Sequence, residues 1–309
     1  MSNRCKRCIL SEKYCKLTNG ICEHCISAIP LIKSTVLDLT DKLDLFIKST
    51  KAWNLDHESN YDATLMLSGG KDSAYVLHKL RNEYPDLRIL CLTINNGFMS
   101  ESAICNASKV AELTKTDSII INSKTKYFYK KLKQAFLDLK GRGSYGTVDF
   151  ADGSSIFQTG QEITQSMDIP YMIGGISWVQ AEQIIGINDF IKYNDNFKII
   201  FPLVVWRTNE QEIRSYVRSN NLLPVGQDSP VVSNNQLILT MCAIDILNIG
   251  YCSFEPEFAQ LIREGKADRK TWLHAFELLE YGTKKGRLSK EINQTLKKLE
   301  LNLSEIIGD

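Results

Sequence analysis

One short segment combines the residue types that bind phosphate. It reads Ser68-Gly69-Gly70-Lys71-Asp72-Ser73. The two glycines let a backbone approach an anion closely, and the N–H groups that open a following helix point toward it. The lysine adds positive charge and the two serine hydroxyls add donors. The carboxylate of the aspartate can help to hold Mg²⁺ or order the loop. The spacing therefore indicates a phosphate-binding turn.

The lysine follows the glycine pair at once, so this loop differs from the GxxxxGK(S/T) loop of the common nucleoside triphosphatases. It resembles instead the SGGxDS loop of the PP-loop ATP pyrophosphatases, which also lies between an apolar strand and a helix. The resemblance implies that ATP is split between its α- and β-phosphates. The loop would hold the departing pyrophosphate while AMP passes to a substrate oxygen, with Lys71 and Asp72 in catalytic positions.

Such a loop needs a parallel sheet to position it. Short apolar stretches predict strands at 61–67, 88–94, 118–122 and 171–174. Helical periodicity fills the intervals, at 71–82, 100–114 and 127–140. Strands that alternate with helices favour an α/β fold with a doubly wound parallel sheet. The resemblance to the PP-loop enzymes implies that this sheet is of the adenine nucleotide α-hydrolase kind.

Two further strand ends are expected beside the nucleotide. Ligands of open parallel sheets bind at the carboxyl ends of the strands. Thr93 and Asn95 close the second predicted strand, and the resemblance implies that backbone groups near 92–94 read the adenine edge. Gly174 and Gly175 close another strand and would allow close approach to ATP.

The first residues predict a metal site. Cys5 and Cys8 form one CxxC pair and Cys22 and Cys25 form a second. Each pair aims two thiolates at one ion, and four thiolates leave no open position, so a structural Zn²⁺ is expected. An iron–sulfur cluster is the less favoured alternative. The dipeptide at 19–20, Asn-Gly, supplies a turn before the second pair.

The chain divides into four expected segments. These are a zinc knuckle at 1–28, a linker helix at 29–58, an ATP-binding α/β domain at 59–206 and an α-helical, substrate-covering region at 207–309. Helices of the last region are expected at 209–220, 235–249, 255–264, 269–280 and 290–300. The glycine- and serine-rich stretch 141–160 reads as a mobile loop near a site.

Three polar features beyond the loop have two readings each. The turn at 228–234 either contacts substrate or caps a helix. Glu255 and Glu257 read as a solvated first helical turn, with a catalytic base as the alternative. A basic helix face at 130–133 reads as a solvated surface, with weak nucleic-acid binding as the less favoured reading.

Within the PP-loop enzymes, the chain resembles two kinds of enzyme: amidotransferases and thioamide-forming enzymes. The knuckle, the stretch 95–101 and the stretch 250–269 are similar to bacterial N-acetyl sugar amidotransferases of surface-polysaccharide pathways. These enzymes replace an activated oxygen with ammonia from a glutaminase partner. That family shows a basic GRATDH-type stretch after a Gly-Tyr pair, whereas this chain has Cys252-Ser-Phe-Glu-Pro-Glu. The departure weighs against a sugar substrate and brings a thiol to that position.

A thiol there favours sulfur transfer. Thioamide-forming PP-loop enzymes of antimetabolite pathways, such as the one leading to 6-thioguanine, have a similar layout. In this hypothesis a cysteine desulfurase loads Cys252 or Cys105 as a persulfide, and sulfur replaces the adenylated oxygen of a small molecule. Cys252 is expected in an exposed turn, and Cys105 faces the site or solvent. Amide formation with a glutaminase is the first alternative. An RNA-binding protein with a nucleotide-sensing loop, or a tRNA-thiolating enzyme, is the second.

Composition sets the remaining bounds. Apolar residues make up 43% and charged residues 24% of the 309, and the net charge is +1. These values are ordinary for a globular protein and do not favour nucleic acid as a partner. Nine cysteines, without an export signal or a span of ~18 apolar residues, predict a cytoplasmic protein away from membranes. A homodimer is compatible with this sequence.

Overall fold

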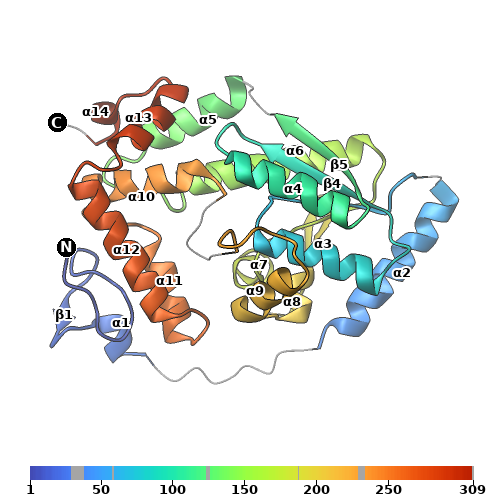
Figure 1. The fold of residues 1–309 in the computed structure, drawn as a ribbon, viewed down its shortest axis with the longest axis horizontal. Coiled ribbons are helices and arrows are strands. Elements are labelled where there is room, and N and C mark those ends of the chain that lie inside the picture. The colour runs from blue at the N-terminus through green and yellow to red at the C-terminus, as the bar shows by residue number, and fades with distance from the viewer. Residues whose placement is uncertain (29–37, 58, 123–125, 187, 229–233, 308–309) are drawn as a thin grey trace. The chain divides into compact units, whose positions relative to one another are not determined.

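The computed structural model describes residues 1–28, 38–57, 59–122, 126–186, 188–228 and 234–307. The chain forms two compact units (Figure 1). The knuckle unit comprises Met1–Ile32, Lys124–Ser155 and Asn235–Asp309, and the sheet unit comprises Lys33–Ser123 and Ile156–Asn234. Each unit therefore joins stretches that are distant in sequence, and the division cuts across the four expected segments.

The sheet unit is built on six strands in the order β5-β4-β3-β6-β8-β7. They span β3 Ala63–Met66, β4 Ile89–Asn95, β5 Asp117–Asn122, β6 Tyr171–Ile173, β7 Ile191–Asn194 and β8 Phe197–Ile200. All neighbouring pairs are parallel except β7–β8. The expected α/β fold with a predominantly parallel sheet is confirmed. Every residue of β3 is buried, because helices cover both faces of such a sheet.

Sequence periodicity did not predict the β7–β8 hairpin. Its turn is made by Asp195 with φ of +53°, a conformation that Asp tolerates better than most residues. The apolar run from Ile199 continues without a break into α8, Pro202–Trp206, so the end of the strand is hidden in one hydrophobic stretch. Proline at the first position of α8 makes the break, since its ring starts helices readily.

The other helices of the sheet unit are α2 Thr40–His57, α3 Lys71–Glu83, α4 Glu101–Leu113, α7 Trp178–Ile185 and α9 Glu210–Ser219. The expected linker helix at 29–58 corresponds to α2, whereas its residues 29–37 and 58 lie outside the described residues. Leu39, Leu43 and Ile47 are buried in the core of the sheet unit. This segment therefore packs on the sheet.

The expected mobile loop at 141–160 is wrong over most of its length, because α6 spans Val148–Ser166. Glycine inside a helix costs about 1 kcal/mol relative to alanine, which hides the helix from a propensity reading. Packing explains Gly160, since a Cβ there would lie 2.6 Å from Sδ of Met66 and 3.0 Å from Sδ of Met172. The missing side chain lets the helix approach the sheet.

The knuckle unit contains a small hairpin and a set of helices. Its elements are β1 Leu17–Thr18, β2 Ile21–Cys22, α1 Glu23–Ile26, α5 Lys126–Leu137, α10 Gln236–Asn248, α11 Glu255–Arg263, α12 Arg269–Lys284, α13 Ser289–Lys298 and α14 Leu303–Ile307. Asn19 and Gly20 have φ of +53° and +80° in the turn between β1 and β2, which confirms the predicted Asn-Gly turn.

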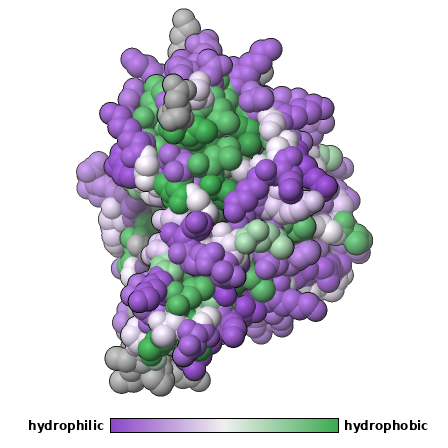
Figure 2. Space-filling model, turned by 90° about the vertical axis from the view of Figure 1, so that its left-hand side faces the viewer, coloured by the Kyte–Doolittle hydropathy of each residue, from purple (hydrophilic) through white to green (hydrophobic). Residues whose placement is uncertain are grey.

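Apolar side chains also reach the surface. One face of the molecule carries an apolar area bordered by hydrophilic residues (Figure 2). Exposed large apolar side chains of the knuckle unit include Leu247 on α10 and Leu278 on α12. Within the described part of the chain, no helix has the length and hydropathy needed to cross a bilayer.

Candidate active site and metal centre

The 68–73 loop connects the carboxyl end of β3 to the first turn of α3. Gly69 has φ of +72°, and a Cβ on it would lie 1.9 Å from the carbonyl oxygen of Ala103 on α4. Gly70 is the N-cap of α3 and offers no side-chain cap. The first N–H groups of a helix lack intrahelical acceptors. The uncapped amides of α3 therefore form an anion-binding turn at the edge of the sheet that the fold class assigns to ligands.

The two serines of the loop organise its backbone. Ser73 Oγ lies 3.1 Å from Ser68 Oγ, accepts from the N–H of Ser68 at 3.2 Å and donates to the carbonyl of Gly70 at 3.2 Å. Ser73 is buried, whereas Ser68 is exposed. The inner serine thus shapes the loop, and the outer serine remains accessible to a ligand.

Charge at the loop comes from three side chains. Lys71 Nζ lies 2.9 Å from Asp72 Oδ2. Glu210, in the first turn of α9, is their neighbour: burial raises its pKa, the charge of Lys71 lowers it and that of Asp72 raises it. Oε1 of Glu210 is buried and has no hydrogen-bond partner among the described residues. This arrangement presents one cation and two carboxylates beside the anion-binding turn.

Sequence reasoning missed Glu210. Its segment reads as a helix start, and Asn209 and Glu212 do form a capping box, with reciprocal bonds of 3.0 Å and 2.9 Å. The available signal was the second acidic residue at the helix start, which the cap does not use.

Residues on both sides of the turn at 228–234 lie near the loop. Asn106 on α4 donates to the carbonyl of Gly69 at 3.4 Å and to Oε1 of Gln227. A Cβ on Gly70 would lie 2.5 Å from Nδ2 of Asn234. Of the turn at 228–234, which the sequence reads as a substrate contact or a helix cap, Asn234 lies against the loop, while residues 229–233 lie outside the described residues.

Asp228 is held by two arginines of α9. It is 1% exposed, and its Oδ2 lies 3.1 Å from Nε of Arg214 and 2.7 Å from Nε of Arg218. Burial would raise the pKa of this carboxyl, but the hydrogen bonds from both arginines outweigh burial and lower it. The ion pairs fasten the 228 segment to α9.

Thr93 and Asn95, the two residues at the end of β4 that are expected to contact the nucleotide, form hydrogen bonds within the sheet unit. The hydroxyl of Thr93 is buried and donates to the carbonyl of Leu67 at 2.7 Å. Asn95 donates to Oδ1 of Asn122 at 2.8 Å and accepts from the N–H of Gly97 at 3.0 Å. These bonds engage the side chains of both residues, so any contact with ATP there would fall to backbone groups.

Gly174 and Gly175 serve close packing. A Cβ on Gly174 would lie 2.4 Å from the ring of Phe201. A Cβ on Gly175 would lie 2.6 Å from Cβ of Ser73 and 3.0 Å from the carbonyl oxygen of Met66. The absence of side chains thus lets Phe201 and the start of α3 pack closely against this glycine pair, and the expected close approach of a nucleotide stays a prediction.

The expectation of an exposed Cys252 is wrong. Cys252 is 0% exposed, in the turn before α11 of the knuckle unit. Burial, followed by the hydrogen bond to Cys242, raises the pKa of its thiol well above the usual value. Sequence placed it in a turn correctly, but the N-terminal segment packs against this turn, where the ring of Tyr14 lies 5.2 Å from that of Tyr251 and Ser11 donates to Glu255.

Cys105 is exposed on α4 of the sheet unit. Ala103 and Asn106, on the same helix, contact the loop. Successive residues turn by ~100° around a helix, so Cys105 lies about 130° from the middle of that contact face. The sequence left open whether the Cys105 thiol faces the site or the solvent, and in the structure it is exposed to solvent.

The four cysteines of the two CxxC pairs converge. All four are buried, and their sulfur atoms lie within 4.8 Å of one another. Burial would raise the pKa of Cys5, but backbone N–H groups of Cys8, Cys22 and Arg7 lower it to about 6. Burial raises the pKa of Cys8 to about 11. A bound cation would stabilise this set of thiolates, and the predicted metal-ligating cluster is confirmed as a geometry.

Buried charges attach this cluster to the helices of the knuckle unit. Arg269 donates to the carbonyls of Cys8 at 2.7 Å and Cys5 at 2.9 Å. Arg4 lies 2.9 Å from Glu255 and 3.1 Å from Glu280. Glu255 is 0% exposed and also accepts from the N–H of Ser11, so the expected solvated turn at Glu255 is wrong.

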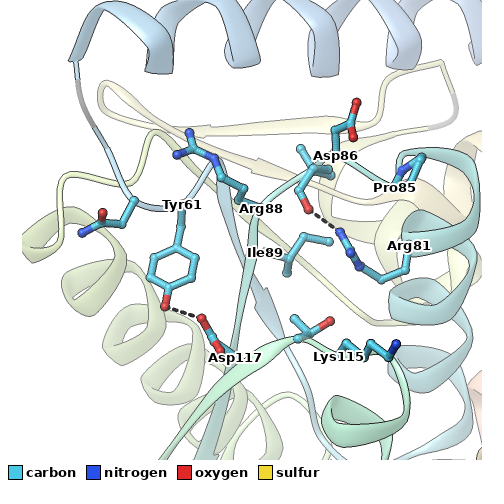
Figure 3. Close-up of a pocket in the computed structure, with 11 residues that line it drawn as sticks. Tyr61, Arg81, Pro85, Asp86, Arg88, Ile89, Lys115 and Asp117 are labelled. Atoms are coloured by element: carbon cyan, nitrogen blue, oxygen red, sulfur yellow. Dashed lines mark hydrogen bonds between the residues drawn. The ribbon is translucent and has the colours of Figure 1, made fainter.

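A cavity of about 460 Å³ lies elsewhere in the sheet unit (Figure 3). Its lining comes from the amino ends of β3, β4 and β5, the edge opposite the 68–73 loop. Arg88 pairs with Asp62 at 2.8 Å, and the hydroxyl of Tyr61 donates to Asp117 at 2.8 Å. The first of these is an ion pair and the second a hydrogen bond within the protein, and the position of the cavity differs from the ligand edge of this fold class.

Comparison with known proteins gives distant similarities. No protein-family model matches the chain. An uncharacterized protein of Methanocaldococcus jannaschii is 29% identical over 126 residues, which are 38% of this chain and 42% of that protein. The match therefore spans less than half of the relative's length.

Three solved structures are similar at low identity. A U34-tRNA thiolase from Methanococcus maripaludis with its 4Fe-4S cluster has 13% identity and a TM-score of 0.41, covering 92% of this chain and 87% of that one. NMN synthetase from Francisella tularensis has 13% identity and a TM-score of 0.39, covering 83% and 96%. Phosphoadenylyl-sulfate reductase from Candida auris, in a phosphate complex, has 15% identity and a TM-score of 0.38, covering 64% and 91%. These values are too low to transfer a function.

Proposed function

We propose that this chain is an AMP-forming ATP pyrophosphatase that adenylates a carbonyl or amide oxygen of a small molecule. The observation that carries the proposal is the 68–73 loop at the carboxyl end of β3, with uncapped amides, an accessible Ser68 and Lys71 at the first turn of α3. Its spacing is that of the pyrophosphate-holding loop and not of the triphosphatase loop.

In the proposed step, the acceptor oxygen forms a bond to the α-phosphorus of ATP. The bond from that phosphorus to the bridging oxygen breaks, and pyrophosphate leaves with the electron pair. Negative charge grows on the leaving group, where the loop amides and Lys71 stabilise it. The adenylated oxygen is then a good leaving group, and an incoming nucleophile displaces AMP.

A magnesium ion fits this site. Oε1 of Glu210, which is buried and has no hydrogen-bond partner among the described residues, and the neighbouring carboxylate of Asp72 supply the oxygen ligands that Mg²⁺ prefers. When bound, the ion neutralises phosphate charge. Asp72 and Glu210 would hold it, while Lys71 contacts the pyrophosphate oxygens. The raised pKa of Glu210 is the expected property of a carboxylate that gains its counter-charge only with the ligand.

The metal in the knuckle is proposed to be Zn²⁺. Bonds of about 2.3 Å from one tetrahedral ion place sulfur atoms about 3.8 Å apart. Cys8 Sγ and Cys22 Sγ lie 3.6 Å apart, and all four sulfurs lie within 4.8 Å. A four-iron cluster binds each thiolate to a different iron and so needs a wider cage. The compact set favours a single structural ion.

The nucleophile is proposed to come from outside this chain. The burial and raised pKa of Cys252 oppose its use as a persulfide carrier, and Cys105 faces away from the loop-contacting side of α4. These placements favour an external donor, either sulfide from a sulfur-delivering protein or ammonia from a glutaminase. Thiolation or amidation of a small-molecule acceptor are the two outcomes.

Product analysis tests the adenylation. Protein incubated with ATP labelled at the α-phosphate, Mg²⁺ and candidate acceptors should release AMP and pyrophosphate in equal amounts. Lys71→Ala should lower this turnover by about 10³-fold, as loss of one stabilising group does in other enzymes. Lys79→Ala, on the same helix but outside the loop, is the matched control. ADP as the product would exclude the proposed reaction.

The donor is tested in the same assay. Ammonium or sulfide is supplied to wild type and to the Cys105→Ser, Cys252→Ser double variant. Equal turnover by both proteins with an added donor is expected. Turnover that requires either thiol would contradict an external donor while leaving the adenylation step intact.

A further inference from the structure

The strand β5 forms one edge of the sheet (Figure 1). Among the described residues, β4 is the one strand that pairs with it. Its sequence is Asp-Ser-Ile-Ile-Ile-Asn, without lysine, proline or glycine. Such edges expose backbone donors and acceptors, and proteins usually protect them with charged side chains, above all lysine, or with proline. All six side chains are exposed or half-buried, and Ile119 is 36% exposed. The edge is therefore open to another strand.

Polar groups at both ends of β5 are engaged within the sheet unit. The hydroxyl of Tyr61 donates to Oδ2 of Asp117 at 2.8 Å, as Figure 3 shows. Nδ2 of Asn95 donates to Oδ1 of Asn122 at 2.8 Å. The one charge of the strand is thus satisfied by a neighbour, and three consecutive isoleucines remain between the two ends.

We propose that β5 pairs antiparallel with β5 of a second copy of this chain, around a two-fold axis at Ile120. A two-fold axis perpendicular to the sheet does not exchange the two faces of the sheet. Each residue must therefore pair with a residue whose side chain points to the same face. With Ile120 opposite its own copy, Ile119 faces Ile121 and Ser118 faces Asn122. Every isoleucine meets an isoleucine, and the polar residues meet each other.

Other registers match poorly. Centring the pairing on Ile119 would set Asp117 against Ile121 and Ser118 against Ile120. Centring it on Ile121 would set Ile120 against Asn122. Opposed apolar side chains stabilise cross-strand pairs, whereas a charged or polar partner loses that contact. In the register centred on Ile120, β5 is complementary to itself. This favours β5 of a second copy, and not a strand of an unrelated protein, as the strand that pairs with it.

Pairing of one short strand buries less surface than a standard permanent interface. The dimer should therefore be reversible and depend on concentration. Sedimentation equilibrium of the full, metal-loaded chain tests it across roughly two orders of magnitude of concentration. The expected result is a mass that rises from that of the 35.0 kDa monomer to twice that value.

Ile120→Lys should raise the dimer dissociation constant about tenfold or more, since it removes the central apolar pair and opposes two like charges. Tyr193→Lys is the matched control, because Tyr193 is 60% exposed on β7, the opposite edge strand. The control should leave the dissociation constant unchanged. A monomer at every concentration, or a dimer that Ile120→Lys does not weaken, would overturn the proposal.

Cross-linking checks the register without adding charge. Opposed residues of antiparallel strands have Cα atoms about 4.5–5.5 Å apart, which a disulfide can bridge. In a Cys105→Ser background, Ile120→Cys should form a covalent dimer under mild oxidation. Ser118→Cys, which faces Asn122 in this register, should not. Stronger cross-linking by Ser118→Cys would refute the two-fold at Ile120.

Discussion

The backbone of Gly69 packs against the carbonyl of Ala103, so that a Cβ on Gly69 would lie 1.9 Å from that oxygen. Gly69 also has φ of +72°. The 68–73 loop is therefore held by the backbone of α4 and needs glycine for two separate reasons.

Gly69→Ala should lower the free energy of unfolding by about 3 kcal/mol, through the strained φ and the clash with α4. Gly141→Ala is the control, because Gly141 has φ of +77° but no atom within 4 Å of an added Cβ. The control should cost only the conformational part, about 1 kcal/mol. Denaturant unfolding measures both, and equal losses would show that the contact with Ala103 does not matter.

Asn106 fixes the loop from α4, since it donates to the carbonyl of Gly69 and to Gln227. Asn106→Ala removes about 1.5 kcal/mol of hydrogen bonding, so the dissociation constant for ATP should rise about tenfold. Ser108→Ala, at an exposed position of the same helix, should leave ATP affinity unchanged. Calorimetric titration with ATP is the measurement. Unchanged affinity in Asn106→Ala would separate this residue from the nucleotide site.

Removing the metal should loosen the knuckle unit. Arg269, the first residue of α12, donates to the carbonyls of Cys5 and Cys8. Hydrogen bonds therefore connect the backbone of the cysteine cluster to α12. Purified protein should contain one Zn²⁺ per chain, and a strong chelator should increase amide hydrogen exchange in 1–28 and in α12.

Cys8→Ser should reduce the zinc content to a small fraction of wild type. Cys15→Ser is the control, because Cys15 is not a member of the converging set. Iron and a visible absorption band in place of zinc would contradict a single-ion site.

Protonation of the Glu280 carboxyl should lower the stability of the protein at acid pH. Burial would raise the pKa of this carboxyl, but the hydrogen bonds of Lys284 and Ser2 and the charge of Arg4 outweigh burial and lower it from 4.5 to about 2. A carboxyl with a lowered pKa in the folded state stabilises the protein above its unfolded pKa. That contribution is lost as pH falls from about 4.5 toward about 2.

Over this interval the free energy of unfolding of wild type should fall by up to about 3 kcal/mol more than that of Glu280→Gln. Wild type and Glu280→Gln have the same cysteines, so protonation of the cysteine cluster affects both proteins equally. The difference between their free energies of unfolding therefore reports on the Glu280 carboxyl. Glu291→Gln, at an exposed position, should follow wild type. Parallel curves for wild type and Glu280→Gln would contradict the role of this carboxyl.

The sequence by itself determined the features that depend on local spacing. The order of β3, the 68–73 loop and α3 follows from an apolar stretch, a glycine pair and a helical period. The turn at Asn19 and Gly20 follows from the φ values that these residue types tolerate. Two CxxC pairs predicted a four-sulfur cluster, since each pair places its own two ligands. Such features need few contacts from distant segments.

Only the tertiary structure decided which side chains reach the loop and which thiols are covered. Glu210, Asn106 and Gln227 gather around the loop from separate elements. The acidic start of α9 marks Glu210 as a spare carboxylate, but no local pattern says that it reaches the loop. The turn at Cys252 is buried because Glu255 is held by Arg4 and by Ser11, a residue 244 positions away in the chain. Burial is a property of the assembled chain, so a turn that looks exposed in sequence becomes core when a distant segment packs over it.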